Sequence, residues 1–214
     1  MVLTLYGNPK ASCTQRVATV MHEKQVPFKL VTIDLSKGEH KAPDYLEKQP
    51  FGQIPVLDDD GYLIYETRAI SRYIAEKYAD QGTPLIPKDL KAKGHFEQAA
   101  SVEQANYDAY AGKAVVEKVF KPMFGQTPDD AVAERLLTSL EASLDVYEKI
   151  LSKQKYVAGN EITLVDIFHL PLLSLLPLTG RDVYSTRPNV EKWAKGLIAR
   201  PSFQSVKDGV KSTA

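Results

Sequence analysis

The amino-acid sequence predicts an α/β domain followed by an all-helical domain. Short runs of strand-forming residues occur within residues 1–80, and no strand pattern returns after residue 88. A stretch rich in glycine and proline (QGTPLIP) separates the two regions. The length of 214 residues falls between the usual sizes of one domain and two. We therefore expect a first domain at residues 1–80, a linker at 81–88 and a helical domain at 89–214.

The first domain begins with a strand-helix-strand unit. Residues 2–6 (VLTLY) form a β-type run that Gly7 and Pro9 end, and residues 28–33 form a second run after Pro27. Between them, from Ser12 on, side chains recur at helical spacing. This stripe consists of Cys13, Val17, Val20, Met21 and Lys24. A unit of about thirty residues in this order predicts parallel pairing of the two strands.

The sequence of the rest of the first domain predicts a hairpin between two helices. Residues 44–48 favour a short helix within a polar stretch, and residues 66–78 have the spacing of a longer one. Residues 54–57 and 62–65 are strand-like and are separated by Asp-Asp-Asp-Gly, which is typical of a hairpin turn. The expected order is β-α-β-α-β-β-α, with a mixed sheet.

The second domain carries two long helical patterns and a capping signal. Residues 89–120 predict one long helix, and residues 129–151 predict another. The apolar stripe of the latter is Val132, Leu136, Leu140, Leu144, Tyr147 and Leu151. Thr163 and Asp166 have the spacing of a capping box, with Ile162 and Ile167 as its hydrophobic staple. We interpret this motif as structural.

Composition excludes several classes of protein. Lys+Arg and Asp+Glu both number 27, so the chain lacks the basic excess that nucleic acids or acidic membranes would require. A single cysteine cannot form an internal disulfide, and the four histidines are too scattered for structural zinc, so we expect no metal. The apolar residues 162–178 are interrupted by Asp166, Pro171 and Pro177, which argues against a membrane span. A cytoplasmic protein is expected.

Residues 7–14 are a candidate anion-binding segment. A strand ends and a helix begins there, so backbone N–H groups and the positive end of the helix would face a ligand. The hydroxyl of Ser12 or Thr14 could donate a further hydrogen bond. Taken alone, however, Ser12 fits better as the N-cap of its helix.

Three dipeptides in the same domain could complete a binding site. Ile54-Pro55 begins a strand, and a cis bond there would leave backbone groups free for an extended peptide ligand. Glu66-Thr67 lies at a strand-to-helix junction and could bind an amino group and a carboxylate, although Glu66 could equally favour only its own helix. His40-Lys41 could supply positive charge or could simply be solvated.

These segments resemble the phi class of the cytosolic glutathione transferases, particularly fungal members. The resemblance rests on GEHK at residues 38–41, QPFGQIP at 49–55 and ETRAI at 66–70, and it covers essentially the whole chain. It implies a thioredoxin-like first domain that binds glutathione as cosubstrate and a helical domain that carries a hydrophobic acceptor site. It also implies a homodimer.

The resemblance assigns a role to each candidate residue. His40 and Lys41 would hold the glycine carboxylate of glutathione, and Glu66 and Thr67 the γ-glutamyl end. The cysteinyl part would bind Gln53 and the backbone of Ile54, with Pro55 cis. The acceptor site would be lined from the long helix of the second domain. The candidates are Tyr107, Tyr110, Met123 and Phe124, and any of the aromatic ones could equally belong to the core.

The chain departs from the phi pattern at the catalytic position. The family reads Ser-Thr-x-Thr where this chain has Ala11-Ser12-Cys13-Thr14, so Ala11 aligns with the family serine that stabilises the glutathione thiolate. We predict that Ser12 takes over this catalytic role. The alternative is a mixed disulfide through Cys13, but the place of Cys13 in an apolar stripe favours a packed, inert thiol.

The predicted function is therefore that of a glutathione transferase. It would conjugate the thiolate of glutathione to small apolar electrophiles, with glutathione-dependent reduction of organic hydroperoxides as a further activity. Two alternatives remain open: a ligandin that binds apolar molecules with little turnover, motivated by Ala11, and a thiol transferase that depends on Cys13. We expect neither nucleic acid nor a membrane as a partner.

Overall fold

A computed structural model describes residues 2–214, which form two compact units. Unit 1 comprises the residues up to Ile86 together with Arg200–Ala214, and unit 2 comprises Pro87–Ala199. The sequence analysis assigns residues 200–214 to the helical domain, whereas the structure groups them with the first unit. Within residues 2–214, every helix is too short or too polar to cross a membrane.

The sheet of unit 1 has the strand order β2-β1-β3-β4. Its strands are β1 (Leu3–Gly7), β2 (Phe28–Thr32), β3 (Val56–Asp59) and β4 (Tyr62–Tyr65). β1 pairs in parallel with β2 and antiparallel with β3, and β3 pairs antiparallel with β4. This confirms the mixed sheet. Asp60 and Gly61, both with positive φ, form the hairpin turn as predicted.

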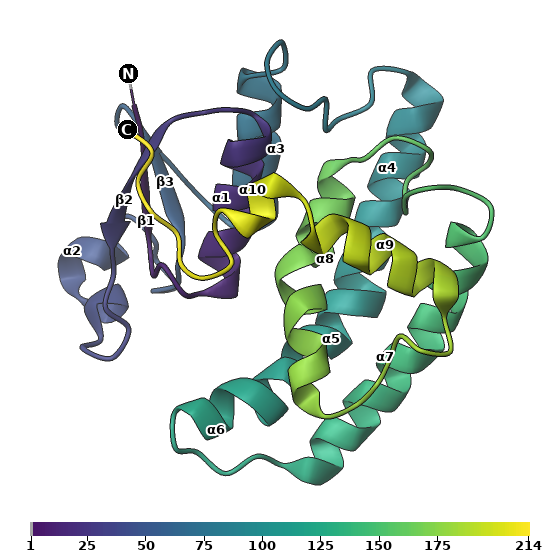
Figure 1. The fold of residues 1–214 in the computed structure, drawn as a ribbon. Helices are drawn as coiled ribbons and strands as arrows, with labels where there is room; N and C mark the ends of the chain where they lie inside the picture. The colour runs from purple at the N-terminus through teal and green to yellow at the C-terminus, as the bar shows by residue number, and fades with distance from the viewer. Residues whose placement is uncertain (1) are drawn as a thin grey trace. The chain divides into compact units, whose positions relative to one another are not determined.

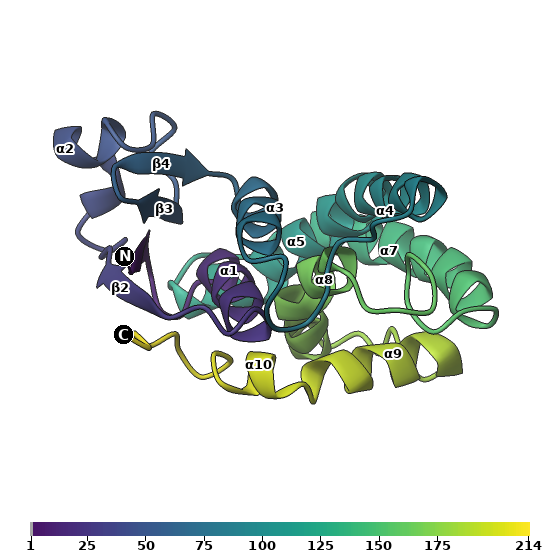
Figure 2. The same cartoon turned by 90° about the horizontal axis from the view of Figure 1, so that it is seen from above.

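Helices cover both faces of this sheet. Figures 1 and 2 show α1 (Ser12–Glu23) and α3 (Thr67–Lys77) on one face and α2 (Pro43–Leu46) on the other. Val17, Val20 and Met21 of α1 are fully buried, as their spacing predicts. A short helix, α10 (Pro201–Gln204), packs against α1. The arrangement is the expected thioredoxin-like one.

A buried ion pair explains why α10 belongs to unit 1. The carboxylate of Glu23, 6% exposed, accepts hydrogen bonds from Arg200 Nε at 2.6 Å and Arg200 Nη2 at 2.8 Å. It also accepts from Ser202 Oγ at 2.5 Å and from Thr83 Oγ1 at 2.6 Å. The end of α1 thereby joins residues that lie up to 179 positions away in the sequence.

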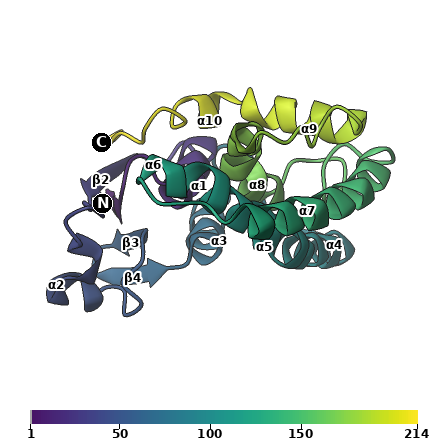
Figure 3. The same cartoon turned by 90° about the horizontal axis from the view of Figure 1, so that it is seen from below.

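Unit 2 is a helical bundle with α8 at its centre. Its helices are α4 (Leu90–Val102), α5 (Ala109–Val115), α6 (Lys121–Met123), α7 (Asp130–Leu151), α8 (Leu164–Leu175) and α9 (Pro188–Ile198). Figure 3 shows α8 between α5 and α9, and every residue from 164 to 173 is buried. The helical second domain is confirmed.

The helix predicted over residues 89–120 is continuous but not uniform. Two π-helical segments, Glu103–Asp108 and Val116–Phe120, interrupt the α-helical geometry. One row of buried positions has a spacing of mostly four residues, and Ala114 is buried beside it; the row consists of Phe96, Ala100, Glu103, Tyr107, Ala111, Val115 and Val119. Because this spacing exceeds the 3.6 residues of an α-helical turn, the wider π turns keep these side chains on the buried face.

The stripe predicted for α7 is correct only in its second half. Leu140, Leu144, Tyr147 and Leu151 are buried, but Val132 and Leu136 are only half-buried, and the neighbouring Ala133 and Leu137 take the buried positions. In the first two turns of α7, the buried positions therefore lie one residue after the predicted ones. The spacing of apolar residues alone could not show this, because it does not say where the neighbouring helix lies.

The capping box at the start of α8 is confirmed. The Thr163 side chain accepts from the first turn, and the backbone N–H of Thr163 donates to Asp166 Oδ2 at 2.8 Å. Asp166 Oδ1 also accepts from Trp193 Nε1 at 3.0 Å and from the N–H of Val157 at 3.2 Å. Burial raises the pKa of the Asp166 carboxyl, and these hydrogen bonds partly counter that rise. The motif has the structural role predicted for it.

Candidate functional site

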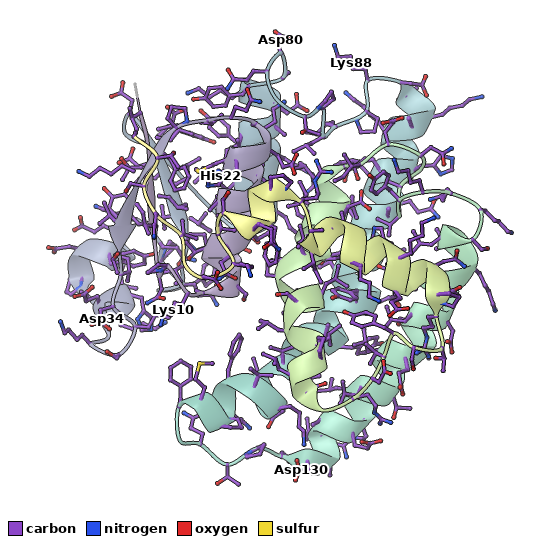
Figure 4. The ribbon with its side chains drawn as sticks, viewed as in Figure 1. Lys10, His22, Asp34, Asp80, Lys88 and Asp130 are labelled. Carbon is purple, nitrogen blue, oxygen red and sulfur yellow. The ribbon has the colours of Figure 1, made fainter. Side chains whose placement is uncertain are left out.

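The strand register brings all four candidate segments to one end of the sheet. Gly7 of β1 lies opposite Thr32 of β2, so residues 8–14 and 34–41 both follow at this end. Figure 4 shows Lys10 and Asp34 there. Val56 pairs with both Tyr6 and Tyr65. Residues 53–55 therefore enter the sheet at the same end, and residues 66–67 leave it there.

Helix α1 begins without a side-chain cap. Ala11 occupies the N-cap position, with φ −74° and ψ 131°, and Ser12 is the first helical residue. The prediction of Ser12 as the N-cap is therefore wrong. The chain turns through backbone hydrogen bonds instead: the N–H of Ala11 donates to Asn8 O at 3.1 Å. With no acidic residue in the first turn, the positive end of α1 is left for an external anion.

The residues at the start of α1 differ in burial. Ser12 and Cys13 are half-buried, whereas Thr14 is fully buried. Burial around the Cys13 thiol raises its pKa, and the charge of Arg16 and hydrogen bonds from the start of the helix oppose this rise without overcoming it. Cys13 is therefore mostly a neutral thiol at neutral pH, which is a poor nucleophile.

Arg16 joins the starts of α1 and α3, and the sequence analysis missed it as a site residue. Its Nη1 donates to Thr67 Oγ1 at 3.0 Å, and both residues are buried. A guanidinium on the buried side of a helix, one turn after the candidate anion site, is the signal that could have identified it. Its positive charge would stabilise an anion bound at the start of α1.

The Ile54–Pro55 peptide bond is cis, as expected. Pro55 is buried, Gln53 is exposed, and Gln53 O accepts a hydrogen bond from the Tyr45 hydroxyl at 2.8 Å. Strand β3 begins only at Val56, two residues later than predicted. The backbone of Ile54 therefore lies before the strand, and a peptide ligand could add to it as a further strand.

His40 and Lys41 form part of a 3₁₀ turn, Glu39–Lys41, at the same end of the sheet. Lys41 Nζ donates to Phe51 O at 2.9 Å. Gly52 has φ +59°, and a Cβ there would lie 2.8 Å from Lys41 Nζ, so glycine allows the lysine to lie close to this loop. The Lys41 ammonium has three N–H donors, so two of them can still donate hydrogen bonds to a carboxylate.

Glu66 occupies an unusual backbone conformation at the start of α3. Its φ is +70° and its ψ 113°, a region that residues other than glycine rarely adopt. Its side chain is exposed and makes no capping hydrogen bond within residues 2–214. Thr67, buried beside it, accepts from Arg16 and keeps its own O–H to donate. The junction thus presents a carboxylate and a hydroxyl.

The acceptor-site candidates in unit 2 differ sharply in exposure. Tyr107 is fully buried, so of its two alternatives the structure supports core rather than acceptor site; its ring packs against His169, with ring centroids 4.5 Å apart. Helical spacing identified Tyr107 but could not separate core from surface. Tyr110 is half-buried, whereas Met123 and Phe124 are 68% and 71% exposed. Only the last three remain candidates.

Comparison with known proteins gives two family matches. The family model "Glutathione S-transferase, N-terminal domain" matches residues 1–76. The model "Glutathione S-transferase, C-terminal domain" matches residues 113–201.

Curated relatives and solved structures agree with these matches. Glutathione S-transferase PM239X14 of Arabidopsis thaliana is 47% identical over 197 residues, covering 90% of both chains. Glutathione S-transferase hmp2 of Hypomyces subiculosus is 43% identical, covering 95% of this chain and 96% of its own. The crystal structure of glutathione transferase F7 from Populus trichocarpa has a TM-score of 0.92 at 39% identity, covering 97% and 98%. A glutathione S-transferase-I bound with lactoylglutathione has a TM-score of 0.89 at 32% identity, covering 97% and 99%.

Proposed function

Because the chain belongs to the glutathione S-transferase family, and within it to the phi class, we propose that it ionises the thiol of glutathione at the start of α1 and adds the sulfur to small apolar electrophiles. In this step the thiol proton passes to solvent, a carbon–sulfur bond forms, and the electron pair of the broken bond leaves with a halide or similar group. The convergence of four segments at one end of the sheet carries the proposal.

The charges at this end complement those of glutathione, which has two carboxylates and one ammonium. Lys41, with His40 beside it, binds the glycine carboxylate. Glu66 binds the ammonium, and Thr67 with the N–H groups at the start of α3 binds the neighbouring carboxylate. Gln53 and the backbone of Ile54 hold the cysteinyl part as an added strand. This places the sulfur toward the start of α1.

Ser12 is the proposed donor to the thiolate. Ala11 stands at the N-cap without a hydroxyl, and Ser12 is the next residue, half-buried at the first helical position. The uncapped N–H groups of α1 and the charge of Arg16 contribute to the same anion. The raised pKa of Cys13 argues against a thiol transferase, because a neutral thiol is slow to form a mixed disulfide.

A conjugation assay with an activated aryl halide tests the assignment. We expect Ser12→Ala to lose about tenfold or more in kcat/KM, as for the loss of one oriented donor. Cys13→Ser should keep wild-type conjugation, and Ala11→Ser should keep or raise it. Full activity in Ser12→Ala would contradict the role of Ser12, and glutathione-dependent disulfide reduction that Cys13→Ser abolishes would favour the thiol transferase.

A ligandin is the second candidate function, because Ala11 removes the hydroxyl at the cap position. Calorimetry and activity assays together separate the two functions. A ligandin would bind glutathione or an apolar dye in calorimetry, but the wild type would show no turnover of aryl halides or organic hydroperoxides. Turnover of a hydroperoxide would add the peroxidase activity to the transferase. Exposed Met123 and Phe124 are the apolar side chains that we propose for the acceptor, together with Tyr110.

We also propose a homodimer in the cytoplasm. Phe51 and Tyr62 of unit 1 are 65% and 53% exposed, and an interface between two copies of the chain would cover such side chains. Light scattering on the eluted protein should give about twice the 23.8 kDa of one chain. A mass of one chain would contradict the dimer, and imaging of a tagged chain tests the location.

A further inference from the structure

The closing segment, residues 207–214, runs along unit 1 after α10. Figure 1 shows it, in yellow, passing the loop between β1 and α1 and then running beside β2. Val210 is 3% exposed, and Val206 just before the segment is fully buried. The segment is therefore packed against the unit, although nothing in its sequence (KDGVKSTA) predicts a helix or a strand.

One part of the closing segment contacts the start of α1 from two sides. The N–H of Val210 donates to Pro9 O at 3.0 Å, before Ser12 in the sequence. Gln15 Nε2 donates to Lys207 O at 3.1 Å, one turn after Ser12, and Gln15 is 8% exposed. The donor residue of each hydrogen bond is buried, Val210 at 3% and Gln15 at 8% exposed, which limits competition from solvent.

The other part of the closing segment covers the edge of the sheet. The N–H of Phe28 donates to Thr213 Oγ1 at 3.0 Å, and the N–H of Thr213 donates to Phe28 O at 2.9 Å. The N–H of Leu30 donates to Ser212 Oγ at 2.9 Å. These bonds occupy edge groups of β2 that would otherwise be open. They lie along β2 rather than at α1, so they can be removed separately.

The loop before α1 depends on such external contacts. Ala11 has no side chain that could cap the helix, so the positions of Ser12 and of the first N–H groups depend on how residues 8–11 are held. On one side Asn8 Nδ2 holds the loop to Ile33 O at 3.3 Å. On the other side the contact is Val210 on Pro9.

We propose that the closing segment is a positioning element of the glutathione site, which acts through Val210 on Pro9 and through Lys207 on Gln15. These contacts fix the start of α1 so that the Ser12 hydroxyl and the helix N–H groups meet the sulfur of glutathione. The inference rests on the proposed function, since it assigns a means of holding that same site in place. Gln15 and Val210 are positioning residues and touch no reacting atom.

Two shortened chains separate positioning from simple stabilisation. A chain ended after Gly209 loses both the Pro9 contact and the β2 contacts. A chain ended after Lys211 loses the β2 contacts from residues 212–214 and keeps Val210, so it is the matched control. We expect both to melt at lower temperature than wild type.

Of the two shortened chains, only the one ended after Gly209 should change the chemistry. We expect its kcat/KM at neutral pH to fall about tenfold, because a misplaced donor no longer meets the sulfur. The pKa of the bound thiol should rise by about one unit, the size of one lost hydrogen bond to a charged group. It is read from the pH profile of kcat/KM for the electrophile at saturating glutathione, where the reacting species is the complex of enzyme and glutathione. Gln15→Met, which removes one of the two contacts within a full-length chain, should shift the profile in the same direction.

The proposal would be overturned if the chain ended after Gly209 and Gln15→Met both kept the pH profile of wild type. It would also be overturned if the chain ended after Lys211 shifted as far as the chain ended after Gly209. If the chain ended after Gly209 does not fold, Gln15→Met decides alone: an unchanged profile overturns the inference and a raised pKa supports it. Calorimetry of wild type with glutathione keeps the two hypotheses apart. Absence of binding there refutes the proposed function, whereas normal binding with unchanged variants refutes only the positioning role.

Discussion

Replacing Glu23 should destabilise the protein far more than replacing a surface carboxylate. Glu23→Ala removes the acceptor of four hydrogen bonds from Arg200, Ser202 and Thr83. It also removes the carboxylate that pairs with Arg200, whose side chain is 25% exposed. Breaking a buried pair in this way costs about 3–5 kcal/mol.

Partial exposure of Arg200 places the expected loss near the lower end of that range, about 3 kcal/mol, because water can solvate part of the guanidinium. For a chain of this length each kcal/mol lowers Tm by about 2–4 °C, so Tm should fall by roughly 6–12 °C. Glu191→Ala is the matched control. Glu191 pairs with Lys195 on the surface, with side chains 38% and 74% exposed, so its loss should cost less than about 1 kcal/mol.

The effect should depend on pH with a definite sign. Burial alone would raise the pKa of Glu23, but the hydrogen bonds from Arg200, Ser202 and Thr83 hold it below its ordinary value. Its stabilisation is therefore fully present above the unfolded pKa of about 4.3 and is lost as pH falls through the folded value. Thermal melts of wild type and Glu23→Gln should converge in this acid range. The reasoning would be refuted if Glu23→Ala lowered Tm at pH 7 by no more than Glu191→Ala does. It would also be refuted if the Tm difference between wild type and Glu23→Gln widened in acid.

Three further substitutions test the site. Gly7→Ala should lower the free energy of unfolding, measured in urea, by about 1–3 kcal/mol, because its Cβ would lie 2.6 Å from Thr14 Oγ1. Gly94→Ala, with open space around its Cβ, should be neutral or stabilising. An equal loss in both variants would contradict the packing argument. Glu66→Gly should keep or raise Tm, since it relieves a positive φ, yet weaken glutathione binding about tenfold or more in calorimetry; unchanged affinity would argue against Glu66 as a ligand. Lys41→Gln should weaken the same binding about fivefold, while Lys37→Gln, 73% exposed, should not; equal effects would show only a general loss of charge.

Local patterns predicted most of the fold because they depend on neighbours in the sequence. The strand-like residues 62–65, the Asp-Gly turn and the capping box of Thr163 and Asp166 all involve residues within a few positions, and the structure confirms each. The exceptions arise where tertiary packing decides. Spacing alone could not show that residues 89–120 contain π turns or that Tyr107 is core.

The candidate site was predictable as a set of segments but not as a connected structure. Gln53, Ile54, Glu66 and Thr67 were found from motifs, and the register then showed why they meet at one sheet end. The hydrogen bond from Arg16 to Thr67 spans 51 positions and the bond from Arg200 to Glu23 spans 177. No short pattern encodes such pairs, because each partner is an ordinary polar residue in its own segment.

Ionisation of the glutathione thiol at the start of α1 is the central claim, and the ultraviolet absorbance of the bound thiolate measures it most directly. Titrating the complex of glutathione with wild type should give a thiol pKa at least about one unit below the ordinary value of about 8.5. Ser12→Ala should bind glutathione but return the pKa toward that value, while Cys13→Ser should titrate as wild type does. A bound thiol in wild type with the pKa of free glutathione, or an equal depression in Ser12→Ala, would contradict the account.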